Sequence, residues 1–135
     1  MTDLAAVAFL VGRVAFAGVL GFLALGNLLD HAGSVAYAEQ KGVPLASLSV
    51  PAGSVLLLAG AASVALGFYP LVGAAAVVAF LVPVTLLMHD FWTMEGQRRE
   101  AELAQFLKNV GLLGAALALG AVAGGWPYAI GGTLT

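Results

Sequence analysis

Four long apolar runs, separated by two polar segments and one tight turn at Tyr69-Pro70, make up most of the chain. They cover residues 4–29, 45–68, 71–88 and 106–125, and each approaches or exceeds the roughly 20 residues that an α-helix needs to cross a membrane. No segment has the ten-residue alternation of apolar and polar residues that is typical of membrane-spanning strands. The pattern therefore predicts an all-α protein, a four-helix up-and-down bundle that forms a single domain over residues 1–135.

The two polar segments predict helical structure outside the hydrocarbon core. In the first segment, Ser34 is the expected N-cap of a short helix over residues 34–41, which Gly42 and Pro44 would end. We expect this helix to lie along the membrane interface. In the second segment, residues 93–105 are expected to begin a helix that continues into the fourth span, with its charges facing solvent.

Composition places most of the surface in lipid. Hydrophobic residues make up 61% of the chain and charged residues 9%, whereas soluble domains carry about 25% charged residues. The bilayer is therefore the expected partner of most side chains. The net charge of −2 argues against nucleic-acid binding. With no cysteine and two histidines, we expect no metal site and no intrinsic cofactor.

The distribution of cations predicts an orientation. Because successive helices of an up-and-down bundle alternate in direction, both polar segments fall on one membrane face and both termini on the other. Lys41, Arg98, Arg99 and Lys108 all lie on the face of the polar segments. The positive-inside rule then places that face in the cytoplasm and the termini outside.

A polar cluster follows the third apolar run and marks the first candidate site. His89 and Asp90 come directly after the run, and Trp92 follows at the depth where aromatic rings anchor helices to headgroups. Because successive spans alternate in direction, Lys108 and Asn109 near the start of the fourth span lie at the same depth as the end of the third span. We therefore expect His89 or Asp90 to contact Lys108 or Asn109, with His89 acting either as a helix cap or as a proton shuttle.

Arg13 is the second candidate site, because it lies inside the first span. Nine residues of helix place it about 13 Å from the start of that span, where an unpaired arginine is costly. One alternative is that its side chain bends toward the headgroups on the side of the termini. The other is that it faces the bundle interior, near Ser63 and Tyr69, and takes an acceptor from water, lipid or a ligand.

Several short motifs follow one another in a characteristic order. They are Gly12-Arg13 in the first span, Gly42-Val43-Pro44 in the first polar segment, Gly67-Phe68-Tyr69-Pro70 at the turn, His89-Asp90-Phe91-Trp92 after the third span and Phe106-Leu107-Lys108-Asn109 in the fourth. This order resembles the DoxX family of small four-helix membrane proteins over nearly the whole chain. The resemblance implies a DoxX-like multi-pass domain in the plasma membrane of a prokaryote.

The same resemblance implies a connection to membrane redox systems. Some members of the family are associated with a thiosulfate:quinone oxidoreductase and others with oxidative-stress complexes, so it implies redox subunits as partners and a quinone as ligand. This chain departs from the family pattern in the second span. Relatives often carry a glutamate there, whereas this sequence reads Val55-Leu56-Leu57-Leu58. Proton chemistry that needs that carboxylate has no support in this sequence.

Two functions of different class remain open from the sequence. The first is a membrane subunit without independent catalytic activity that binds a small ligand or a partner protein. The second is a quinone-handling subunit of an oxidoreductase, in which His89 would shuttle protons and Asp90 would orient it. The stripe of Ala116, Gly120 and Gly124 predicts close helix packing, within the chain or in a homo-oligomer.

Overall fold

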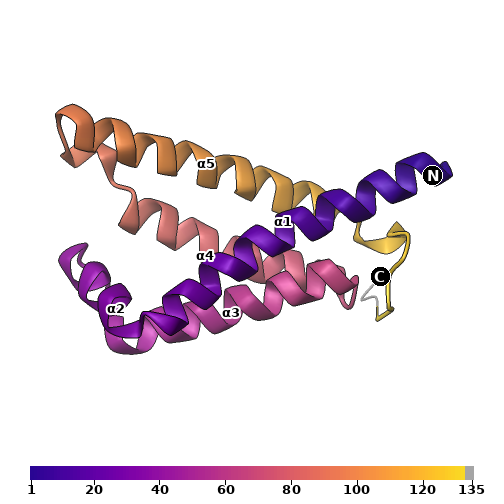
Figure 1. Ribbon diagram of the computed structural model, residues 1–135, viewed down its shortest axis with the longest axis horizontal. Coiled ribbons are helices and arrows are strands. Elements are labelled where there is room, and N and C mark those ends of the chain that lie inside the picture. The colour runs from indigo at the N-terminus through magenta and orange to yellow at the C-terminus, as the bar shows by residue number, and fades with distance from the viewer. Residues whose placement is uncertain (133–135) are drawn as a thin grey trace.

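The computed structural model describes residues 1–132 and is built from helices (Figure 1). Four long helices and one short helix account for most of this part of the chain, with two 3-10 turns between or after them. Their bounds are α1 (Asp3–Leu29), α2 (His31–Gln40), α3 (Ala46–Leu66), α4 (Pro70–Met88), η1 (Phe91–Thr93), α5 (Gly96–Ala121) and η2 (Ala123–Gly125). The predicted all-α architecture is confirmed.

The long helices run up and down in chain order. α1 packs against α3, α3 against α4, and α4 against α5. The start of α1 and the segment after α5 lie at one end of the bundle, and α2 lies at the other end together with the connection between α4 and α5 (Figure 1). Within residues 1–132, four helices have the length and apolar composition to cross a membrane. The short helix α2 is separate from these spans, as the sequence predicts.

The predicted N-cap of α2 is wrong by four residues. Asp30, and not Ser34, is the N-cap, and its Oδ1 accepts a hydrogen bond from the Gly33 N–H over 3.3 Å. An aspartate at this position satisfies a free backbone donor as well as a serine does. The end of the helix is as predicted, because Gly42 follows the C-cap with a φ of +76°.

Helix α5 confirms one prediction and corrects another. It begins at Gly96, inside the polar segment, and runs without a break into the apolar part. It ends at Ala121, four residues before the predicted end of the fourth span, and the glycine-rich residues 123–125 form a 3-10 turn instead. Glycine weakens a helix interior because it gives up more backbone freedom than other residues.

Small residues let the helices approach closely in the core. A Cβ atom added at Gly60 of α3 would lie 3.1 Å from the carbonyl oxygen of Gly73 in α4. Ala17 of α1, Ala61 of α3 and Ala116 of α5 are buried in the same core cluster. Such close backbone contact is how helices associate in lipid, where burial from water provides no driving force between them.

The segment that follows α5 folds back onto the turn between α3 and α4. We call residues 126–131 the C-terminal strap. The N–H groups of Ile130 and Gly131 donate to the carbonyls of Leu66 and Gly67, and the Tyr69 N–H donates to the carbonyl of Gly131. Gly67 is required at this turn, since its φ is +66° and an added Cβ would lie 2.8 Å from Ala129.

Candidate functional site

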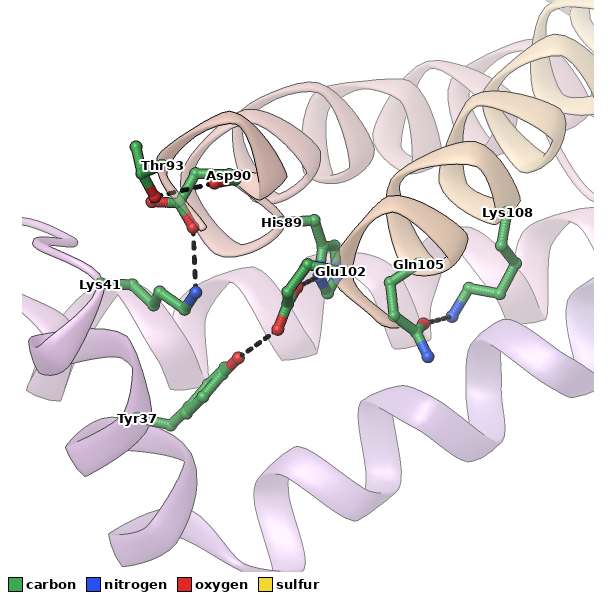
Figure 2. A network of polar contacts seen from close by, with 8 residues as sticks. All are labelled: Tyr37, Lys41, His89, Asp90, Thr93, Glu102, Gln105 and Lys108. Atoms are coloured by element: carbon green, nitrogen blue, oxygen red, sulfur yellow. Dashed lines mark hydrogen bonds and ion pairs between the residues drawn. The ribbon is translucent and has the colours of Figure 1, made fainter. Parts of the chain in front are cut away.

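Two charged networks connect α2 to the segment after α4, at the end of the bundle opposite the termini (Figure 2). In the first, Lys41 Nζ lies 2.9 Å from Asp90 Oδ1. The Thr93 hydroxyl donates to Asp90 Oδ2 over 3.1 Å and also to the Asp90 carbonyl. The Lys41 side chain is 7% exposed and that of Asp90 26%. This ion pair is therefore shielded from water more than a typical surface pair.

The second network joins three helical elements through one carboxylate. The Tyr37 hydroxyl of α2 donates to Glu102 Oε1 of α5 over 3.0 Å, and Glu102 Oε2 lies 2.8 Å from His89 Nδ1, just after α4 (Figure 2). Burial, and next the hydrogen bond to the Glu102 carboxylate, raise the pKa of Tyr37 above its ordinary value. The neutral phenol is therefore the form that the folded protein favours.

These contacts hold a helix that could not be stable alone. α2 has ten residues, and isolated helices of that length are marginal in water. It is fixed by its packing on α3 and by the contacts of Tyr37 and Lys41 with the other side of the bundle. The networks therefore set the position of α2 relative to α3 and α4.

A cavity of about 540 Å³ lies between α2, the end of α1, the first half of α3 and the last half of α4. Much of its wall is apolar, including Val43, Val50, Phe80, Pro83, Val84, Leu87 and Met88. Polar groups are fewer and come mostly from α2 and the helix ends, namely Asn27, Asp30, Ser34, Tyr37, Ser49 and Ser54. An apolar cavity with a few polar groups is the usual form of a small-molecule site.

Ser54 is the deepest of these polar groups. Its side chain is 1% exposed, and its Oγ has no hydrogen-bond partner within residues 1–132. A serine in a helix usually bonds back to a carbonyl one turn earlier or points to solvent. Ser54 does neither, which leaves a free donor and acceptor in the wall of the cavity.

Two of the site residues predicted from the sequence, His89 and Asp90, take part in these networks, but their partners are not the predicted ones. Within residues 1–132, neither His89 nor Asp90 is hydrogen-bonded to Lys108 or Asn109, so the predicted pairs are wrong. Lys108 is exposed and donates to Gln105 one turn earlier on α5 (Figure 2). The actual partners are Lys41, which the sequence used only to predict the orientation, and Glu102, which it assigned to solvent.

Within residues 1–132, the side chains of Asn109 and Trp92 do not join the networks. Asn109 is 5% exposed on the inner face of α5. Trp92 is 54% exposed and makes edge-to-face contacts with Phe91 and Phe106. An exposed indole at this level suits the predicted anchoring role. The spacing of Glu102, Phe106 and Asn109 at i, i+4 and i+7 is the signal that could have placed Glu102 inward.

Arg13 is buried at the opposite end of the bundle. Its side chain is 1% exposed, and its two terminal nitrogens donate to the carbonyls of Pro127 and Tyr128 in the C-terminal strap. Its Nε donates to the Ala65 carbonyl of α3 over 3.4 Å. The guanidinium carbon also lies 5.3 Å from the centre of the Trp126 ring.

Of the two alternatives for Arg13, the structure shows the one in which the side chain faces the bundle interior, but the expected partners are wrong. Ser63 donates to the Phe68 carbonyl instead, and the acceptors of Arg13 belong to the chain itself. Every residue has a backbone carbonyl, so the sequence does not show which carbonyls accept hydrogen bonds from Arg13. The strap could therefore not be recognised as its partner. Arg13 is a structural tie between α1, α3 and the strap.

The described residues contain no group of three or more His, Asp or Glu side chains that could hold a metal ion. The fold and the cavity define a small α-helical membrane protein with four spans and a cavity beside the short helix α2.

The chain is 25% identical over 113 residues to the inner membrane protein YphA of Escherichia coli strain K12. The alignment covers 84% of this chain and 81% of that protein. No family model and no solved structure matches the chain. The four spans and this bacterial inner-membrane relative identify a multi-pass protein of a prokaryotic plasma membrane.

Proposed function

We propose that this protein is a membrane-embedded binding module that holds a small, mainly apolar molecule in the cavity beside α2. The observation that carries the proposal is the cavity itself. Its volume of about 540 Å³ falls within the range of about 300–1,000 Å³ that is typical of ligand sites. Its apolar wall suits a molecule that reaches the protein through the lipid.

The networks at α2 support this function by fixing one wall of the cavity. Tyr37 lines the cavity while its hydroxyl is bonded to Glu102, and Lys41 is bonded to Asp90 at the end of α2. A wall held in place before binding reduces the entropy that a ligand must remove. In keeping with the DoxX resemblance, we propose that the protein works as a subunit beside membrane or soluble redox proteins.

A quinone-handling role is the second candidate, and one observation favours it. Tyr37 of the cavity wall, Glu102 and His89 form a continuous hydrogen-bonded series. Such a series offers a path for a proton between the cavity and the end of α4. In this version a partner redox subunit supplies the electrons, and the cavity holds the quinone ring.

The test is to purify the protein in a mild detergent and identify small molecules in the extract by mass spectrometry. Val84→Trp fills the cavity, while Val82→Trp adds the same bulk to an exposed position on the same helix. We expect one apolar molecule per chain from the wild type and Val82→Trp, and a large loss from Val84→Trp. Equal amounts from all three, or none from the wild type, would overturn the proposal.

The same extract separates the two candidates. A stoichiometric quinone, recognised by the change in its ultraviolet spectrum on reduction, supports the quinone-handling role. A different molecule at one per chain, with no quinone, supports the binding module alone. Proteins that remain bound in the detergent identify the partners.

A further inference from the structure

The chemistry of the cavity wall restricts the polar part of its ligand. Asp30 is the single charged residue in the wall, and the wall has no lysine or arginine. The Lys41 ammonium is engaged by Asp90. An anionic headgroup in the cavity would therefore meet one carboxylate and no cation.

Most of the hydroxyl and carboxyl groups in the wall already have partners. The Tyr37 hydroxyl donates to Glu102, and the Ser49 hydroxyl donates to the carbonyls of Pro44 and Leu45. The carboxylate of Asp30 accepts from the Gly33 N–H as the cap of α2. The hydroxyl protons of Tyr37 and Ser49 are therefore already donated within the protein.

Ser54 is different because it is both buried and unpartnered. Its Oγ is shielded from solvent and has no hydrogen bond within residues 1–132, and the residue lines the cavity with Phe80 and Val84. A buried hydroxyl without a partner destabilises the folded protein. A ligand with a hydrogen-bond acceptor at this position would remove that cost, which a purely apolar ligand cannot do.

We infer that the cavity selects a neutral amphiphile whose carbonyl oxygen, as in a ketone, ester or amide, accepts a hydrogen bond from Ser54. Its apolar body lies against Phe80, Val84 and Leu87. This inference rests on the proposed function and adds the specificity. Ser54 favours a ligand with an acceptor over a purely apolar one, and the absence of a cation from the wall disfavours a carboxylate.

The test compares three probes with the same apolar body, namely 2-dodecanone, laurate and dodecane, on the purified full chain in nanodiscs. Ser54→Ala removes the donor, and Ser47→Ala is the matched control, because Ser47 is exposed on the same helix and lies outside the cavity wall. Binding is measured against empty nanodiscs and against Val84→Trp. The infrared carbonyl band of the bound ketone reports its hydrogen bond directly.

We expect the wild type and Ser47→Ala to bind 2-dodecanone with a carbonyl band shifted to lower frequency, and to bind laurate at least about tenfold more weakly. Ser54→Ala should lose the shift and bind the ketone about tenfold more weakly, with dodecane unchanged. Specific binding that Ser54→Ala leaves intact, or equal binding of laurate, would overturn this inference alone. If no probe binds above empty nanodiscs, the proposed function falls with it.

Discussion

Lys41 and Asp90 are 49 residues apart in the sequence and form an ion pair with a 2.9 Å contact. This pair joins the C-terminal end of α2 to the residues that follow α4. Since α2 and α4 are two walls of the same cavity, the pair controls how far apart those walls can move. A polar contact outside the spans therefore determines the shape of an apolar site within them.

Breaking this pair should loosen α2 without unfolding the spans. We expect Lys41→Met and Asp90→Asn each to increase amide hydrogen exchange in residues 31–40, and the double variant to behave like either single one. The coupling free energy between the two side chains should be about 1 kcal/mol, because the pair is partly exposed. Glu39→Gln, an exposed change on the same helix, is the control. Exchange in Lys41→Met equal to that of the control would show that the pair does not hold α2.

Tyr37 should make stability depend on alkaline pH. Burial and the Glu102 hydrogen bond raise its pKa in the folded state, so the unfolded chain loses this proton first as the pH rises. The contribution of Tyr37 to stability is then complete below about pH 10, the value of an unperturbed tyrosine, and is lost as the pH rises through the higher folded value. Ultraviolet titration of the phenolate checks this directly. Tyr37→Phe should remove a phase above pH 10, and removal of a phase below that pH would contradict the assignment.

Arg13 should determine whether the C-terminal strap stays bound. Arg13→Met leaves three carbonyl groups without their donor, and we expect a loss on the order of 2–4 kcal/mol. Hydrogen exchange in residues 126–131 should rise sharply, whereas Val11→Met, at an exposed position of α1, should change little. Arg13→Lys should be intermediate because an ammonium cannot reproduce the planar fork. A strap that stays protected in Arg13→Met would show that its contacts with residues 66–69 are sufficient.

The predicted orientation can be tested because the chain contains no cysteine. Asp3→Cys places a single thiol at the start of α1, and Gln97→Cys places one at the exposed start of α5. In intact cells, a membrane-impermeant maleimide should label Asp3→Cys, while Gln97→Cys should react only after the cells are opened. The reverse pattern would place the termini in the cytoplasm and contradict the positive-inside prediction.

The four spans were predictable from sequence because a charge-free run of sufficient length has few alternatives to a helix in lipid. The partners of the polar residues were not. His89 and Glu102 are in contact because α5 begins at Gly96, well before its apolar part, and the side of this helix that carries Glu102 faces the bundle. The cavity depends on the mutual packing of α2, α3 and α4, and Ser54 reads in the sequence as an ordinary small residue of an apolar run. The depth of a residue along its span follows from one helix alone. Side-chain contacts between helices depend on how each helix is rotated about its axis.

The C-terminal strap has a consequence for the order in which the protein is made. Arg13 is synthesised 114 and 115 residues before Pro127 and Tyr128, whose carbonyls accept from it. Until residues 127 and 128 are made, the two terminal nitrogens of the guanidinium lack their carbonyl acceptors and must rely on water or lipid headgroups. The first of the four described spans is thus the last to be fully secured, because the strap that holds its arginine is made after the other three spans.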